Sequence, residues 1–395
     1  MMTVAARYAP LSAELTLLAA CDLDSDAALA DRVASASKNG LYWQRFERLA
    51  FGNEMAGLVG ARLAQVAPDA LPADMAERMR LALQQQSMMQ IAQTAGAAAL
   101  TRQFAEAGVR SIVLKGMAAA HMLYPADPAW RISCDIDLLI DHADLITSDR
   151  LLRAAGYERT WPEQLPAVGA DTFDLLANVF TYLSPNTGVV IELHHRITLN
   201  PHWLPVSFVD LHAASLEIAT RFGTIRGLDG PLLVQYLSLH ALAHHGYRLK
   251  WFCDIARALR RASAESCGQY VGNHAPPLAT YPGELVDNVL AAIGYALDQP
   301  SDGQRTMQGA AQRILADMEN PVDLPSSRSL SGLWGELRFL RFLMRLSPGL
   351  RGKGVQFLLS ASDPRDVDVL RLDARFAPVY AVLGPALALW RGIRR

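Results

Sequence analysis

Three acidic residues lie in two short apolar segments that have the composition of β-strands. Asp135 and Asp137 occur in DIDLLI at 135–140, and Glu192 occurs in VVIELHHR at 189–196. Because side chains alternate between the two faces of a strand, Asp135 and Asp137 leave the same face, roughly 6 to 7 Å apart. The other face of each segment is aliphatic, so we expect strands anchored in a core with an open acidic face.

The spacing of these carboxylates suits a divalent metal ion. Two carboxylate oxygens at this distance can hold one Mg²⁺, or bridge two metal ions about 4 Å apart. If the second strand lies beside the first, Glu192 completes a cluster of three acids, as a metal ligand or as the general base for an attacking hydroxyl. Such a site supports transfer of a nucleotidyl or phosphoryl group. The alternative is a solvated sheet face that carries three ordinary acids.

A Lys115-Gly116 turn follows a compact β-branched run at 109–114 and precedes helix-forming residues at 117–123. The first turn of a helix offers free N–H groups and a partial positive charge to a phosphate. Gly116 lets a phosphate approach the backbone, and Lys115 adds a point charge. The turn lacks the GxxxxGK[ST] pattern of a P-loop, and the alternative is a tight turn without a ligand.

Two further side chains near the acids are candidates for substrate contacts. Arg131 precedes the acidic strand and could hold a triphosphate, neutralise a carboxylate or lie on the surface. His194 shares the face of Glu192 and could orient it, whereas His195 faces the other way and is expected to be structural.

A pair of histidines, His240 and His244, lies four residues apart on one face of a predicted helix. These histidines could line the nucleotide or acceptor site, form part of a zinc site, or pack at a domain contact. The metalloprotease signature is missing because no Glu follows the first His. We expect Arg248 and Lys250, which follow the pair, to lie at a solvated helix end.

The elements that position these residues change from helical to β periodicity and back. Asp24 or Ser25 can cap a helix, and Gly108 can end one. The pattern predicts helices at 27–37, 41–65, 73–107, 143–155, 231–262, 284–297 and 332–346, and strands at 109–114, 134–140, 181–183 and 189–195.

We therefore predict an α+β fold with a small mixed β-sheet core flanked by helices. The helical N-terminal region covers 1–107, the α/β core covers 108–200, and the C-terminal region at 201–395 is expected to be helical. The last region includes Arg338, Arg341 and Arg345 among aromatic residues, which we expect to form the charged face of a packed helix rather than a nucleic-acid or membrane contact.

The composition is that of a soluble globular protein. Hydrophobic residues make up 51% of the chain and charged residues 19%, with a formal net charge of −2. This balance provides no overall basic field, so we do not expect nucleic acid as a partner.

The cysteines and the N-terminus favour a cytoplasmic protein. Cys21, Cys134, Cys253 and Cys267 form no CxxC pair, which is typical of reduced thiols. The N-terminus lacks the pattern of a signal peptide, and no apolar run reaches about 18 residues, so we expect no membrane span.

Taken together, these motifs resemble the uncharacterised nucleotidyltransferase family of bacteria, within the DNA polymerase β-like nucleotidyltransferase superfamily. The resemblance rests on LKG, a helix, YP, an Arg, DIDLLI, a helix ending in GY, and IELHHR. It extends to LSLHALAHHGYRLKWFCDIARAL and covers about residues 40–265. It implies a small mixed sheet whose first strand leads into a helix at the substrate phosphates.

The resemblance also implies roles for individual residues. Asp135 and Asp137 match the paired acids and Glu192 the third acid, which bind Mg²⁺ (or Mn²⁺) and transfer a nucleoside monophosphate from an NTP, with ATP as the expected donor, to an acceptor hydroxyl. Gly116 matches the glycine after the first strand. Lys115-Gly116 stands where the superfamily usually has Gly-Ser, so the serine hydroxyl that would touch a terminal phosphate is missing.

Family members also occur near genes for ribosomal peptide natural products, which implies a peptide or a small metabolite as acceptor. Two other functions remain open. One is a non-catalytic nucleotide-binding or scaffold protein with the same fold. The other is a metal-dependent hydrolase that uses His240 and His244.

Overall fold

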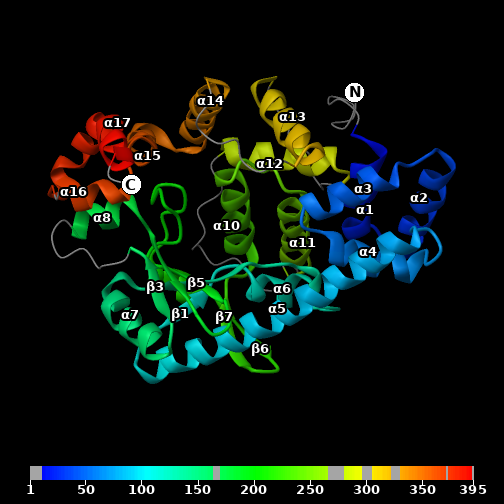
Figure 1. Cartoon of the computed structure of the whole chain (residues 1–395), viewed down its shortest axis with the longest axis horizontal. Helices are drawn as coiled ribbons and strands as arrows, with labels where there is room; N and C mark the ends of the chain where they lie inside the picture. Colours follow the sequence, from blue (N-terminus) through cyan, green and yellow to red (C-terminus); the bar gives the residue numbers. More distant parts are fainter. Residues whose placement is uncertain are drawn as a thin grey trace. The chain divides into compact units, whose positions relative to one another are not determined.

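The computed structural model describes residues 11–162, 170–265, 280–295, 305–321, 330–370 and 372–393, so Cys267 lies outside the described residues. The chain divides into two compact units made of interleaved segments (Figure 1). Unit 1 contains residues 1–99, 115–134 and 214–325, and unit 2 contains residues 100–114, 135–213 and 326–395. Helices predominate and strands form a mixed arrangement, which confirms the predicted α+β fold class.

Unit 2 is built on strands in the order β3-β4-β5-β2-β1. Their bounds are β1 Ser111–Val113, β2 Asp135–Ile140, β3 Glu158–Trp161, β4 Val179–Leu183 and β5 Val190–His194. Strands β2 and β5 run parallel, whereas the other neighbouring pairs of this unit are antiparallel. Aliphatic side chains such as Ile136, Leu138, Ile191 and Leu193 are fully buried, so the two central strands are anchored as predicted.

The predicted hairpin is formed by β4 and β5. Leu183 pairs with Val190, and the N–H of Gly188 donates to the carbonyl of Ser184 at 2.9 Å across the turn. The edge strand β3 was not predicted, because its four residues alternate between exposed and half-buried and leave only a weak apolar pattern.

The helices of unit 2 lie between these strands and after them in the chain. They are α7 Leu145–Ala154, α8 Ala170–Leu176, α9 Phe208–Ala213, α14 Leu330–Leu346, α15 Gly349–Ala361, α16 Val367–Leu370 and α17 Ala377–Ile393, with 3-10 turns η3 His142–Asp144, η4 Pro364–Asp366 and η5 Ala374–Phe376. The buried Asn200 side chain, after β5, donates to the carbonyl of Gly352 at 3.0 Å and to Gln356 at 3.1 Å. These bonds fasten the segment after β5 to α15. Arg338, Arg341 and Arg345 are exposed on α14.

Unit 1 is mainly helical. It holds α1 Ala13–Leu23, α2 Asp26–Lys38, α3 Trp43–Gly52, α4 Ala56–Val66, α6 Met117–Leu123, η2 Pro128–Trp130, α10 Gly230–Ala243, α11 Leu249–Glu265, α12 Thr280–Ala292 and α13 Arg305–Glu319. The helix α5 Ala73–Glu106 begins in unit 1 and ends in unit 2. Helices α10 and α11 lie side by side (Figure 1). Ser25 caps α2 by accepting from the N–H of Ala28, as one of the two predicted caps.

A β-hairpin corrects the expectation that residues after 200 are helical. Strands β6 Leu216–Thr220 and β7 Gly223–Gly227 pair antiparallel, with Ile218 opposite Ile225. The alternating pattern of a strand is present in LEIAT, but it spans only five residues. The two-residue turn Arg221-Phe222 also lacks the Asn-Gly or Asp-Gly signature that identifies a hairpin from sequence.

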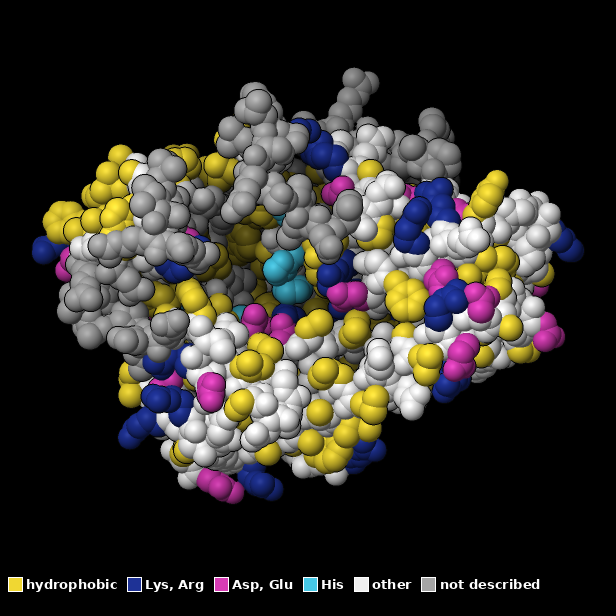
Figure 2. Space-filling view, in the orientation of Figure 1, with side chains coloured by type: hydrophobic (Ala, Val, Ile, Leu, Met, Phe, Trp, Pro, Cys, Tyr) yellow, Lys and Arg dark blue, Asp and Glu magenta, His cyan; other side chains and the backbone are white. Residues whose placement is uncertain are grey.

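The distribution of surface charge and the hydropathy of the helices concern nucleic acid and membranes as possible partners. Figure 2 shows Lys, Arg, Asp and Glu side chains interspersed on the visible face rather than gathered into one field of a single sign. Among the described residues, no helix combines the length and the apolar character needed to cross a membrane.

Candidate metal centre

The register of two parallel strands brings Asp137 and Glu192 side by side. Asp137 on β2 is opposite Glu192 on β5, and Asp135 is opposite Val190. Asp135 lies two residues before Asp137 on the same strand face and is half-buried. Two of the three acids singled out from the sequence are therefore direct neighbours.

His194 joins these two acids. Its Nε2 atom lies 3.2 Å from Asp137 Oδ1 and 3.5 Å from Glu192 Oε2. One ligand atom from each of the three residues lies within 4.8 Å of the others, a group that does not include Asp135. The Asp137 side chain is fully buried, whereas the Glu192 side chain is 34% exposed. Two carboxylates and an imidazole form a donor set that suits a divalent cation.

The charge of His194 is set by the two acids. Burial disfavours the charged ring, but the hydrogen bonds and charges of Asp137 and Glu192 outweigh burial and raise the pKa of His194 to about 9. The imidazolium is thus a counterion for the two carboxylates at neutral pH. A divalent cation at the same place would compete with its proton.

The Lys115-Gly116 turn directly follows Leu114, a residue that bonds to the acidic strand β2. The N–H of Leu114, the preceding residue, donates to the carbonyl of Asp137 at 3.0 Å. Gly116 precedes α6 with φ 60° and ψ −123°, a conformation that is open to glycine and strained for other residues. Lys115 is half-buried.

Arg131 is buried and holds this turn from inside unit 1. Its Nε and Nη2 atoms lie 2.9 Å from Asp254 Oδ2, and its Nη1 donates to the carbonyl of Gly116 at 3.1 Å. Asp254 also accepts from the Tyr124 hydroxyl at 3.0 Å. Of the roles considered for Arg131, neutralisation of a carboxylate is the one observed.

His240 and His244 belong to an aromatic cluster at the end of α10. Their ring centroids are 4.7 Å apart, and they lie 5.7 and 5.8 Å from the ring of Trp251. Within the described part of the chain, neither histidine belongs to a group of three potential metal ligands. The described residues therefore show no third ligand for a zinc site or a hydrolase centre at these two histidines.

Lys250 does not lie at a solvated helix end, contrary to the expectation. Its side chain is only 12% exposed and forms an ion pair with Glu54, which also pairs with Arg248. Burial opposes the charge of Glu54, but the two cations outweigh it and lower the pKa of Glu54. No local pattern indicates this ion pair, because Glu54 and Lys250 are 196 residues apart.

A second group of potential ligands, His142, Asp174 and His195, was not predicted. The Nε2 atom of His142 lies 2.7 Å from Asp174 Oδ2, and the His195 ring is buried beside them. Burial and then the charge of Arg196 lower the pKa of His195 to about 4, so this ring is neutral. A weak signal existed in the sequence, because His142 and His195 each lie within two residues of the end of an acid-bearing strand.

Comparison with known proteins agrees with the motifs. The model of the uncharacterised nucleotidyltransferase family matches residues 39–275, which is more than half of the 395-residue chain. The matched range includes the acidic strands, the Lys115-Gly116 turn and the α10–α11 pair. No curated protein and no solved structure matches the chain. The chain belongs to the uncharacterised nucleotidyltransferase family.

Proposed function

We propose that this protein is a divalent-metal-dependent nucleotidyltransferase of the DNA polymerase β-like superfamily. It moves a nucleoside monophosphate from an NTP to an acceptor hydroxyl and releases pyrophosphate. The observation that carries the proposal is the register pairing of Asp137 with Glu192 inside the family match. The cluster with His194 adds a donor set of the right kind.

Each acid has a distinct part in this mechanism. Asp135 and Asp137 would hold Mg²⁺ or Mn²⁺, which supplies neutralisation of the charge that develops on the phosphoryl oxygens. Glu192 is a metal ligand or takes the proton of the acceptor hydroxyl, and its partial exposure suits contact with an acceptor. His194 contacts both Asp137 and Glu192 and orients them.

The turn before α6 receives the triphosphate. Gly116 leaves its backbone open to a phosphate, and Lys115 takes the place of the missing serine hydroxyl as a charged contact. Arg131 is proposed as a positioning residue for the substrate, because it donates to the carbonyl of Gly116 in this turn. His240 and His244 are proposed to line the nucleotide or acceptor side through their aromatic cluster.

The donor and acceptor follow from the family resemblance. We propose ATP as the donor and a peptide natural product or a small metabolite as the acceptor, in a bacterial cytoplasm. Incorporation of label from each of the four α-labelled NTPs into metabolite and peptide fractions would identify both partners.

The first test removes the charge of one acid at a time. Asp137→Asn and Glu192→Gln remove a metal-binding charge without changing side-chain size, so we expect label transfer and pyrophosphate release to fall roughly 100-fold or more. Asp135→Asn should act in the same direction. Glu158→Gln, an exposed acid on β3 of the same sheet, is the matched control and should retain activity.

Turnover retained by both Asp137→Asn and Glu192→Gln would reject this mechanism, provided that the circular dichroism spectra match that of the wild type. The replacement of Gly-Ser by Lys115-Gly116 favours a second candidate, a nucleotide-binding scaffold without turnover. A thermal shift with NTP and Mg²⁺, but no pyrophosphate release by the wild type with any acceptor fraction, would support the scaffold.

A further inference from the structure

The group His142, Asp174 and His195 is assembled by the strand register of unit 2. Leu139 on β2 is opposite His194 on the parallel strand β5, so the residues that follow both strands leave the same edge of the sheet. His142 lies two residues beyond β2, and His195 directly follows β5. Val179 pairs with His194 on the other side of β5, which brings the end of α8 and its Asp174 to the same edge.

The atoms of this group are close enough to share one ion. One ligand atom from each residue lies within 4.8 Å of the others. The rings of His142 and His195 have centroids 5.1 Å apart in an edge-on arrangement. This group differs from the proposed catalytic cluster, because consecutive residues His194 and His195 point to opposite faces.

The hydrogen bonds of His195 prepare one ring nitrogen for a metal. Its Nε2 lies 3.1 Å from the carbonyl of Ala177, which can only accept, so Nε2 carries the proton and Nδ1 has a free lone pair. His195 is only 5% exposed, and Nδ1 is a buried atom without a hydrogen-bond partner among the described residues. Metal-bound histidines commonly donate their second N–H to a backbone carbonyl in this way. A metal ion bound at Nδ1 would explain why this buried nitrogen has no hydrogen-bond partner among the described residues.

We infer that Nδ1 of His195, Nε2 of His142 and a carboxylate oxygen of Asp174 bind a Zn²⁺ ion. Two imidazoles and one carboxylate are a donor set that zinc accepts in tetrahedral sites with a fourth, open position. His142 is 57% exposed, so the fourth position is accessible to water. The ion would tie the ends of β2 and β5 to α8.

Arg196 both supports and opposes this site. Its guanidinium donates to the carbonyls of Leu175 and Ala177, which fixes the segment after Asp174 and the carbonyl that orients His195. The positive charge of Arg196 disfavours the binding of Zn²⁺ nearby. The negative charge of Asp174 offsets this repulsion. The inference does not depend on nucleotidyl transfer.

The test uses the full chain after removal of metal by a chelator. Calorimetric titration with ZnCl₂, and titration with Co²⁺ followed by its visible absorption, report the stoichiometry and the ligand field. We expect His142→Ala to weaken binding at this site roughly 100-fold or more and to remove the corresponding Co²⁺ bands. His142 is exposed, so this variant is expected to fold, and His212→Ala, another histidine of unit 2, is the matched control.

Glu192→Gln separates this group from the proposed catalytic cluster. If the inference holds, His142→Ala and Asp174→Asn each lose one molar equivalent of bound Zn²⁺. Glu192→Gln, in contrast, still binds that equivalent. The inference is overturned if the wild type binds no Zn²⁺. It is also overturned if His142→Ala binds as tightly as the wild type, or if only Glu192→Gln loses the ion. A failure of nucleotidyl transfer would leave these titrations unchanged.

Discussion

At the scale of single residues, the charge of His194 balances the charges of Asp137 and Glu192 in unit 2. Two carboxylates on neighbouring strands would repel each other at the closeness that the register imposes. The imidazolium relieves this repulsion because it lies 3.2 Å from an oxygen of Asp137 and 3.5 Å from one of Glu192. The same two acids are proposed to bind the catalytic metal, so one place in the sheet can hold either a proton or a dication.

This balance predicts a pH dependence of stability for chelator-treated protein. The pKa of His194 rises from 6.5 to about 9 on folding. The folded state therefore keeps a proton that the unfolded state releases. The stabilisation is complete below about pH 6.5 and is lost as pH rises through about 9, and it amounts to on the order of 3 kcal/mol.

Urea unfolding between about pH 6 and pH 9.5 would measure this effect. The free energy of unfolding should fall more steeply with pH for the wild type than for His194→Gln. Equal slopes for the two proteins would show that His194 does not carry the proton in the folded chain.

At the scale of elements, the passage from β1 to α6 depends on one glycine. Gly116 has φ 60° and ψ −123°, and its carbonyl accepts from the buried Arg131. The turn is therefore held both by a conformation that favours glycine and by an internal ion pair with Asp254. This rigidity would keep the backbone that we propose as the phosphate contact in one arrangement.

The glycine requirement predicts that Gly116→Ala destabilises the protein by about 1–3 kcal/mol, because alanine is strained at this φ and ψ. The matched control is Gly354→Ala in α15, where an added Cβ meets no atom within 4 Å. That control should be neutral or stabilising by up to about 1 kcal/mol, since alanine is the better helix former. Thermal unfolding of both variants checks the difference, and equal transition temperatures would contradict it.

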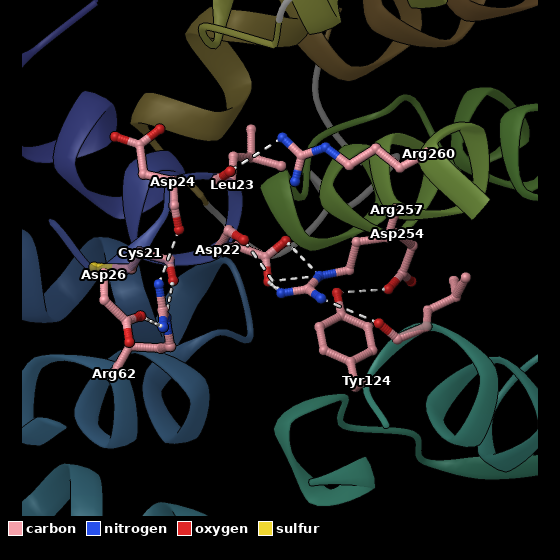
Figure 3. A network of polar contacts seen from close by, with 11 residues as sticks. Cys21, Asp22, Leu23, Asp24, Asp26, Arg62, Tyr124, Asp254, Arg257 and Arg260 are labelled. Carbon is pink, nitrogen blue, oxygen red and sulfur yellow. Dashed lines mark hydrogen bonds and ion pairs between the residues drawn. The ribbon is translucent and has the colours of Figure 1, made fainter. Parts of the chain in front are cut away.

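At the scale of the whole molecule, buried ion pairs join segments that are far apart in sequence. Figure 3 shows Arg257 of α11 between Asp22 of α1 and the segment that ends α6. Arg257 lies 2.8 Å from Asp22 Oδ1, donates to the carbonyl of Leu123 at 3.1 Å, and lies over the Tyr124 ring at 4.2 Å. Residues before the family match, which begins at 39, thus contribute to the core of unit 1.

We therefore expect Asp22→Ala to lower the free energy of unfolding by about 3 kcal/mol. It leaves the largely buried Arg257 without its carboxylate, because Asp22 is fully buried in the pair. Asp24→Ala is the control, because Asp24 pairs with the half-exposed Arg32 and should cost less than about 1 kcal/mol. Chemical denaturation of both variants tests this ranking, and a larger loss for Asp24→Ala would refute it.

Much of the secondary structure and the acidic pattern could be predicted from the sequence. Strands β2 and β5, the β4–β5 hairpin and the helix α6 agree with their predicted positions within a few residues. The strands depend on the alternation of apolar and polar residues over five to seven positions, and the helix depends on a run of helix-forming residues; a single segment contains either pattern in full. The hairpin of β6 and β7 was missed because its strands are short and its turn residues are not characteristic.

The sequence by itself determined that Asp135, Asp137 and Glu192 lie on aliphatic strands, because side-chain alternation is local. Only the tertiary structure decided that Asp137 is opposite Glu192 in a parallel pair, that Arg131 bonds to Asp254, and that His142 and Asp174 meet His195. These contacts join residues that lie from 21 to 123 positions apart in the chain. Strand order and packing select such partners, and no local periodicity encodes them.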